Sequence, residues 1–455
     1  MRPLALLLAF SLPALHAYDA PKIDDEKDRQ VLAGFLQHTA KVTETLTPEY
    51  AKTQAAKDSE SYCWIVLKHQ KMPLTAYHLT GDAKYLDQFV ACFANLQTAL
   101  TQDAKGFKGW YGKPLPIFQN PDQPDLALDV IITSFSAVKV LSEFIETIDA
   151  EPALKEKFAK ERAAYLDLME NHLVKKWEAR GSYVDLGATG AIYRGNPELR
   201  ATKALLTQPH NKHEIITAGL LALHRVTGNA EYLKKAIKLG VRFKHCLSIK
   251  DGAYAWNYWD PAGAWDIDTA DAAKWKHWIG VEHKGGYYSA SLTLAVLLHH
   301  HGLVFDAEDM KRFVKTQTEK AWNGDFENPK WARCDGTTSE KYMQGAYMCG
   351  SLAPFDDRIA KFCFEGARQE ERVKNANHGW QGGIVASGYL EGKYVGRPKA
   401  LGGKQVHKEV GERFRANSEH AAWLKDLEFN VEGAGYVPPK TPPEFKNLPA
   451  EPAAK

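Results

Sequence analysis

A short polar stretch at the start of a predicted helix contains residues suited to acid–base chemistry. In TQPHNKHE, Asn211 and His213 follow Pro209 directly, and an apolar pattern with helical spacing comes next. An amide can donate a hydrogen bond to an anionic group of a substrate, and an imidazole can act as the base that removes a proton from that substrate. The same residues also have a simpler interpretation, in which Asn211 is the helix N-cap and Glu214 is its capping-box partner.

Metal ligation by this stretch is disfavoured by its spacing. His210, His213 and Glu214 are residue types that bind metals, but positions 213–217 read HEIIT, which does not match HExxH. We therefore expect no metal site and no cofactor, although the sequence leaves a structural or catalytic divalent metal open.

A second candidate stretch, WKHWIGVEHKGGYYSASL, surrounds a Gly-Gly pair that leads into an apolar helix. It places His277, Glu282, His283, Tyr287 and Tyr288 around the glycines. The glycines allow backbone to approach a ligand closely, or they simply form the turn. A helix N-terminus at this point favours an anionic group.

A third stretch, YAWNYWDPAGAW, is unusually aromatic. Its rings are Tyr254, Trp256, Tyr258, Trp259 and Trp265. Glycines and polar residues interrupt the rings, so the pattern is not that of an apolar helix face. Rings beside hydrogen-bonding groups suit a pyranose, which has an apolar face and polar edges. The alternative is that the rings only close one end of the fold.

These stretches lie between predicted helical hairpins. AYHLTGDAKYL and LHRVTGNAEYL share one turn pattern, in which Gly81 or Gly228 ends a helix and Asp82 or Asn229 caps the next. Leu297–Val314 is a looser third copy. Apolar residues at helical spacing predict further helices over Asp25–Leu46, Leu126–Ile148, Ala153–Glu178, Glu340–Leu352 and Asp356–Gln369.

Paired helices with internal similarity predict an all-α fold, an (α/α)n toroid of about five or six antiparallel hairpins. The long loops Gly106–Asp125, Gly181–Gln208 and Asp251–Gly285 are expected to meet at one end. An open solenoid is the main structural competitor. The toroid is expected to span residues 18–435, and the proline-rich residues 436–455 to form an extended or disordered tail.

The ends and the bulk composition restrict the class of protein. Residues 1–17 read as a secretory signal with cleavage after Ala17, so we expect a secreted or periplasmic protein. No later stretch is apolar enough to cross a membrane. A net charge of +2 does not indicate a nucleic-acid partner. The six cysteines contain no CxxC pair, which argues against zinc-ribbon or thioredoxin chemistry and leaves their pairing open.

Together, the TG-[DN]-A-x-YL turns, the Asn-x-His at a helix start and EHKGGYY resemble the α/α-toroid carbohydrate-active proteins. These include six-hairpin glycosidases and toroid polysaccharide lyases of the alginate and heparinase kind. The resemblance covers Ser61 to Phe313. In such lyases an Asn neutralises a uronate carboxylate, a His or Tyr removes the C5 proton, and a Tyr protonates the leaving oxygen. The alginate-lyase type has an Asn-Asn-His-x-Tyr run, whereas HNKHE keeps Asn211 and His213, inserts Lys212 and lacks the tyrosine.

The resemblance implies a polysaccharide substrate and β-elimination on a uronic-acid-containing glycan. The intermediate of that reaction carries two negative charges, so donors or cations must lie at the carboxylate. The candidates are Asn211, Arg194 and Lys284 for this role, His213 or His283 as the base, and Tyr287 or Tyr288 as the acid.

Three alternatives to β-elimination remain. The first is glycoside hydrolysis by paired carboxylates drawn from Asp125, Asp129, Glu214, Asp260 and Glu282. The second is an epimerase, which shares the proton abstraction. The third is a non-catalytic glycan-binding protein, which would keep the aromatic stretch without needing the histidines.

Overall fold

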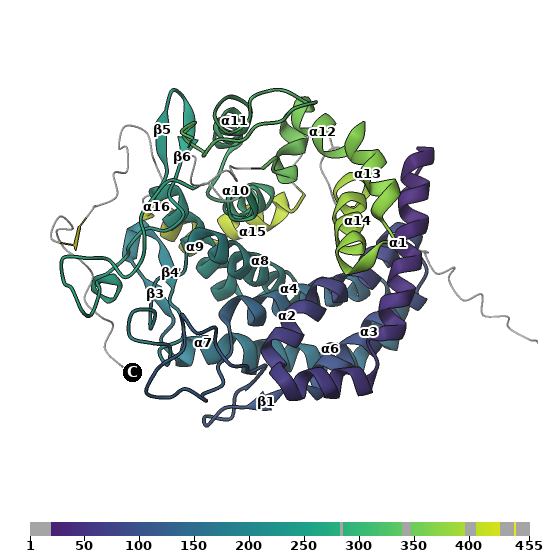
Figure 1. Cartoon of the computed structure of the whole chain (residues 1–455), viewed down its shortest axis with the longest axis horizontal. Coiled ribbons are helices and arrows are strands. Elements are labelled where there is room, and N and C mark those ends of the chain that lie inside the picture. Colours follow the sequence, from purple (N-terminus) through teal and green to yellow (C-terminus); the bar gives the residue numbers. More distant parts are fainter. Residues whose placement is uncertain (1–19, 283–284, 339–346, 396–405, 428–440, 443–455) are drawn as a thin grey trace, which may run out of the picture.

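The repeated turn pattern of the sequence sets where helices end. The computed structural model describes residues 20–282, 285–338, 347–395, 406–427 and 441–442 (Figure 1). In it α2 (Pro48–Thr80) and α8 (His210–Thr227) end at Gly81 and Gly228, with φ of 71° and 72°. This left-handed conformation suits glycine, which has no Cβ to clash. Both predicted helix ends are therefore confirmed.

Asn229, the residue after Gly228, is the N-cap of α9 (Ala230–His245), as predicted. The N-cap of α3 (Lys84–Thr98) is instead Ala83, without a side-chain cap, so Asp82 lies one residue before the cap position. The side chain of Asp82 accepts a hydrogen bond from the backbone N–H two residues later, and that of Asn229 does the same, each at 3.0 Å. In the third copy Asp306 forms a complete capping box with Asp309. These side chains satisfy N–H groups that a helix start leaves without partners.

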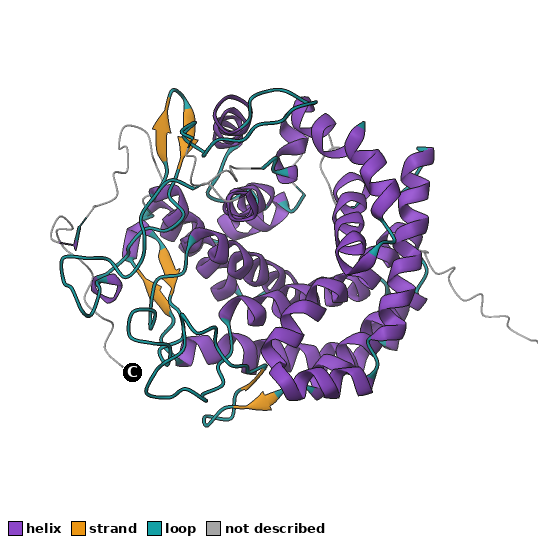
Figure 2. Cartoon of the chain, viewed as in Figure 1, coloured by secondary structure: helices purple, strands orange, loops and turns teal. Residues whose placement is uncertain are grey.

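Helices make up most of the described chain (Figure 2). Besides α2 and α8, the α-helices are α1 (Glu26–Thr45), α3 (Lys84–Thr98), α4 (Ile131–Asp149), α5 (Pro152–Lys157), α6 (Ala159–Asp167), α7 (Lys175–Ala179), α9 (Ala230–His245), α10 (Gly285–His300), α11 (Ala307–Lys315), α12 (Asp357–Phe364), α13 (Ala367–Asn375), α14 (Gly379–Tyr394), α15 (Lys408–Ala416) and α16 (Ser418–Lys425). Two π-helical turns are η1 (Leu168–Val174) and η4 (Thr316–Ala321), and 3-10 turns are η2 (Gly187–Thr189), η3 (Ala264–Asp266) and η6 (Gly350–Phe355).

The strands are short and lie in the loops. They form three antiparallel pairs, β1 (Thr101–Gln102) with β2 (Lys108–Gly109), β3 (Tyr183–Asp185) with β4 (Ala191–Tyr193), and β5 (Ser248–Lys250) with β6 (Ala253–Ala255). The protein is therefore all-α, as the helical spacing predicted.

Some predicted helices have different boundaries. The stretch predicted as one helix over Ala153–Glu178 is divided into α5, α6, η1 and α7, because Phe158 leaves helical geometry and a π-helical turn follows. The stretch Asp356–Gln369 is interrupted at Gly366, which has φ of 54°. Glu340–Leu352 lies partly outside the described residues, and its end is the 3-10 turn η6.

Consecutive long helices pack side by side. α2 contacts α4, α4 contacts α8, and α8 contacts α10, while α3 and α9 pack on α2 and α8 respectively. Late in the chain, α14 contacts both α1 and α2 (Figure 1). An early and a late part of the described chain are therefore neighbours.

A buried carboxylate joins these two parts of the chain. Asp28 in α1 accepts hydrogen bonds from Tyr389 at 2.7 Å and from Gln369 at 3.1 Å, and it also pairs with Lys393 and Tyr394. Burial raises the pKa of Asp28, but these donors outweigh it, so its pKa lies below the ordinary value. The charged carboxylate thus stabilises the contact between α1 and α14.

The hydrophobic core is one contiguous cluster with members from Val31 in α1 to Phe414 in α15. A small second cluster packs Trp265 and Ala262 against the β3–β4 hairpin. No disulfide bond links any two of the six cysteines, all of which lie within the described residues. None of the described helices combines the length and apolarity that a membrane-spanning segment needs.

Candidate functional site

Four of the five rings of the aromatic stretch lie inside the protein. Tyr254, Trp256, Trp259 and Trp265 are each no more than 5% exposed. The indoles of Trp259 and Trp265 donate to the carbonyl and hydroxyl oxygens of Thr207, at 2.8 and 2.9 Å. These rings were expected to bind a glycan. Their burial instead makes them an anchor that fixes the loop against the start of α8.

Tyr258 is the ring of this stretch that remains partly exposed. Its centroid is 5.4 Å from that of Tyr287 and 5.6 Å from that of His277. Tyr287, the second residue after Gly285 in α10, is 39% exposed. Burial, followed by the neighbouring Tyr287 and Glu282, raises the pKa of Tyr258 above its ordinary value. Tyr258, Tyr287 and His277 thus form an accessible polar and aromatic surface at the start of α10.

Tyr288 and Glu282 point into the interior instead. Both are fully buried, and Tyr288 stacks on Trp256 with ring centroids 5.2 Å apart. Burial raises the pKa of Tyr288 well above its usual value. Of the two candidate acids, only Tyr287 is therefore accessible to a substrate.

The first turn of α8 lacks the predicted capping box. Pro209 has an extended backbone and occupies the N-cap position, so the helix begins at His210 without a side-chain cap. Asn211 and Glu214 are consequently both inside the helix. The structure corrects the capping interpretation and leaves these two side chains available for other contacts.

Three side chains of this turn have no polar partner in the described part of the chain. Asn211 is 8% exposed, and its buried Oδ1 accepts no hydrogen bond. Lys212 makes no ion pair, and burial, followed by the like charge of Lys203, lowers the pKa of Lys212 to about 8. Burial raises the pKa of Glu214, while the more distant Lys139 and Lys71 lower it in part.

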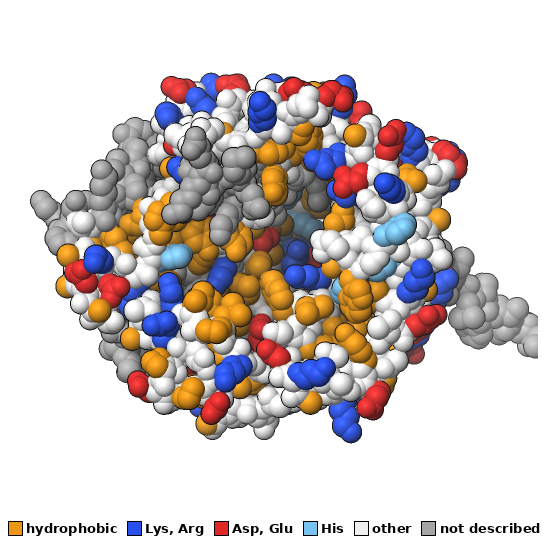
Figure 3. All heavy atoms as spheres, in the orientation of Figure 1, with side chains coloured by type: hydrophobic (Ala, Val, Ile, Leu, Met, Phe, Trp, Pro, Cys, Tyr) orange, Lys and Arg blue, Asp and Glu red, His pale blue; other side chains and the backbone are white. Residues whose placement is uncertain are grey.

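The charged residues that affect Glu214 show that its side of α8 faces α4 and α2. Lys139 belongs to α4 and Lys71 to α2, where Lys71 pairs with Glu391 of α14 at 2.6 Å. Asn211 precedes Glu214 by three residues, so both share one face of α8. In Figure 3 the middle of the face viewed is hollowed, and basic, acidic and histidine side chains lie in the hollow.

His213, a candidate base, is held by the backbone. Its Nε2 accepts the N–H of Tyr193 in β4 at 3.0 Å, and the ring is 2% exposed. Burial, with His210 next in effect, lowers the pKa of His213 to about 3. The lone pair that a base would use is therefore engaged in attaching the β3–β4 hairpin to α8.

The other predicted carboxylate binders have different positions. Arg194 is 4% exposed, donates to the carbonyl oxygen of Gly181 at 2.9 Å and lies 5.2 Å from the Trp265 ring centroid. It packs the loop rather than the first turn of α8. His283 and Lys284 lie outside the described residues.

The start of α8 and the start of α10 meet at the aromatic loop. Asp260 in that loop is hydrogen-bonded to His210 at 3.0 Å and accepts from Asn257 at 2.8 Å. Tyr258 lies between these two loop residues and contacts Tyr287 of α10. A cavity of about 810 Å³ adjoins the loop and is lined by Asn257, His277 and Trp278 among others. Asp260 thus connects the loop to the start of α8, and Tyr258 connects it to the start of α10.

The five carboxylates considered for hydrolysis have different surroundings. Asp125 is on the surface beside Lys113. Asp129 is buried in ion pairs with Lys176 and Arg180. Asp260 and Glu282 are buried as well, which leaves Glu214 as the carboxylate without a hydrogen-bond or ion-pair partner in the described chain.

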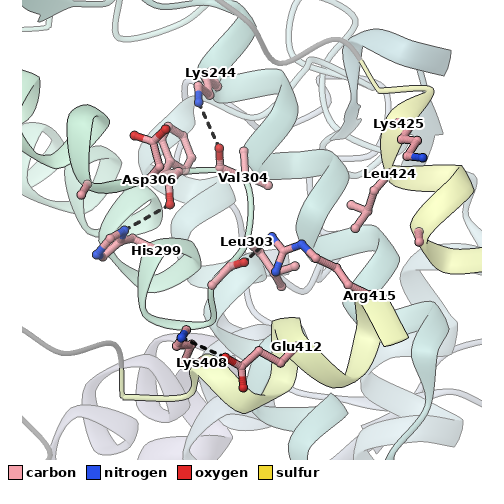
Figure 4. Close-up of a pocket in the computed structure, with 14 residues that line it drawn as sticks. Lys244, His299, Leu303, Val304, Asp306, Lys408, Glu412, Arg415, Leu424 and Lys425 are labelled. Atoms are coloured by element: carbon pink, nitrogen blue, oxygen red, sulfur yellow. Dashed lines mark hydrogen bonds and ion pairs between the residues drawn. The ribbon is translucent and has the colours of Figure 1, made fainter. Parts of the chain in front are cut away.

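A larger cavity than the one beside the aromatic loop lies elsewhere. It has a volume of about 1160 Å³ and is enclosed by the turn between α10 and α11 and by α15 and α16 (Figure 4). Its charges largely satisfy one another, since Lys408 pairs with Glu412 at 2.9 Å and Arg415 donates to the carbonyl oxygen of Gly302. None of the predicted site residues lines it.

Sequence reasoning missed two features of this region. Lys212 was treated only as an insertion into the Asn-Asn-His-x-Tyr pattern. A lysine between two polar residues at a helix start also indicates that an anion could bind there. The contact between His210 and Asp260 joins residues fifty positions apart, and nothing in the local sequence indicates it.

No family model, no curated protein and no solved structure matches this chain.

Proposed function

We propose that this protein is an exported polysaccharide lyase with an α/α-toroid fold, which cleaves a uronic-acid-containing glycan by β-elimination at the start of α8. The observation that carries the proposal is the first turn of α8, where Asn211 and Lys212 have no polar partner in the described chain. Buried polar groups without partners are unfavourable unless a ligand satisfies them. A uronate carboxylate would accept hydrogen bonds from the Nδ2 group of Asn211 and from the ammonium group of Lys212, and a sugar hydroxyl would donate to the buried Oδ1 of Asn211.

The remaining roles are assigned to residues in and just before α10 in the sequence. Tyr287 is the exposed tyrosine at the start of α10 and would protonate the leaving oxygen. His283, four residues earlier in the chain, would be the base, since His213 is engaged by Tyr193. The cavity lined by Trp278 and His277 would hold a neighbouring sugar, with the half-exposed Trp278 stacking on it.

The toroid and the export are part of the same proposal. The contact of α14 with α2 supports a closed ring of paired helices rather than an open solenoid. The apolar residues that precede position 18 support secretion to the periplasm or the medium.

Glycoside hydrolysis is the second candidate, and one observation favours it. The raised pKa of Glu214 is the property that a general acid needs. Hydrolysis also requires a second carboxylate across the bond. The other four candidates are exposed beside Lys113, paired with cations or buried.

The test uses the purified protein with alginate, glycosaminoglycan, pectic and ulvan polymers. Ultraviolet absorbance detects the unsaturated uronate of a lyase, and a parallel assay detects new reducing ends. Variants Asn211→Ala and Lys212→Met should abolish the absorbance signal, whereas Lys105→Met, an exposed lysine in the β1–β2 loop, should retain it. New reducing ends without a rise in absorbance would contradict lyase activity and support glycoside hydrolysis. No signal on any polymer would contradict both.

A further inference from the structure

A buried cluster of three potential metal ligands lies behind the aromatic loop. His210 begins α8, Cys246 follows the last residue of α9, and Asp260 belongs to the loop after β6. One ligand atom from each lies within 4.8 Å of the other two. All three residues are at least 95% buried.

The charge of Asp260 has little compensation. Its oxygens interact with His210 at 3.0 Å and with Asn257 at 2.8 Å, and no lysine or arginine of the described chain forms an ion pair with it. A buried carboxylate is unfavourable unless a positive charge balances it. Nδ1 of His210 is also buried and has no hydrogen-bond partner in the described residues.

We propose that His210, Asp260 and Cys246 form a binding site for a transition-metal dication of the zinc class. Imidazole nitrogen, carboxylate oxygen and thiolate sulfur are the three ligand types that Zn²⁺ takes, at about 2.0–2.3 Å. Atoms within 4.8 Å of each other reach such bonds after small side-chain adjustments. The thiol loses its proton to solvent on binding, and the thiolate and carboxylate together neutralise the dication.

The site acts on structure rather than on substrate. Its ligands come from α8, α9 and the aromatic loop, so the metal ties together the three segments that position Asn211 and Tyr258. Asn257 donates to Asp260 and orients the carboxylate as an outer partner. The inference stands whether or not the protein cleaves a glycan.

Metal binding can be tested on the full chain without a substrate. The protein is stripped with a chelator, and Co²⁺ and Zn²⁺ are titrated in. We expect one equivalent to bind, with a thiolate-to-cobalt charge-transfer band in the near ultraviolet and with release of a proton. Binding of no equivalent, or cobalt spectra without a thiolate band, would overturn the site.

Two variants locate the metal. Cys246→Ser should remove the charge-transfer band and weaken binding by at least about tenfold. Cys92→Ser replaces another buried cysteine, in α3, and should bind metal as the wild type does. Equal loss in both variants would show that the metal is not held by Cys246. Should Cys246→Ser not fold, the cobalt spectrum of the wild type decides alone.

Discussion

Replacement of His213 separates a structural histidine from a catalytic base. In His213→Ala the buried N–H of Tyr193 loses its acceptor, which costs about 1–3 kcal/mol. Removal of the fully enclosed ring adds a cavity, which for large buried side chains brings the total to about 3–5 kcal/mol. This is a large fraction of the roughly 5–15 kcal/mol that stabilises a typical protein. We therefore expect a marked loss of stability.

His213→Gln is the matched variant. A glutamine places its amide at about the position of the imidazole Nε2, so it can still accept from Tyr193 and should lose less stability than alanine. Denaturant unfolding followed by tryptophan fluorescence measures both variants, and turnover is expressed per folded molecule. We expect turnover to stay within about tenfold of wild type, whereas loss of a general base costs about 10²–10⁴. A glutamine variant that is fully stable yet inactive would refute this reasoning.

Three further predictions concern the same structure. Burial raises the pKa of Glu214, so its carboxyl group stays neutral to a higher pH than usual. Binding of an anionic uronate oligomer should weaken as pH rises through this pKa, because Glu214 then becomes negatively charged. Calorimetric titrations of Glu214→Gln should show no such pH dependence. Tyr287→Phe should lower turnover strongly. Tyr288→Phe removes a buried hydroxyl without a hydrogen-bond partner in the described chain, so it should leave turnover and the unfolding midpoint nearly unchanged. Kinetic assays in which Tyr288→Phe loses more turnover than Tyr287→Phe would contradict the assignment. Asp28→Ala should destabilise the protein by about 1–3 kcal/mol, because the buried donors of Tyr389 and Gln369 lose an acceptor. The exposed Asp24→Ala should not destabilise it, and equal denaturant midpoints for the two variants would disprove the role of Asp28.

Local turn chemistry could be predicted from the sequence. Gly81, Gly228 and the caps at Asn229 and Asp306 depend on a few adjacent residues, and all form as predicted. The predicted capping box of α8 does not form, because Pro209 takes the N-cap position and the helix begins at His210, before Asn211. Local rules therefore locate a helix start to within a residue or two.

The candidate site was less predictable because burial depends on distant contacts. The sequence pattern of the aromatic stretch does not reveal that Thr207 accepts both indole N–H groups, which turns the rings inward. Nor does a histidine at a helix start reveal whether its lone pair is used by a strand, as it is in His213. Asn211 kept its candidate role because no distant group satisfies it in the described chain.

The most direct test of the central claim is ultraviolet absorbance of the wild type and Asn211→Ala, side by side, on the panel of uronic-acid polymers. The proposal predicts that absorbance rises with at least one polymer for the wild type and stays flat for the variant, while both unfold at similar denaturant concentrations. A variant that generates unsaturated ends at the wild-type rate would contradict the placement of the site at the start of α8.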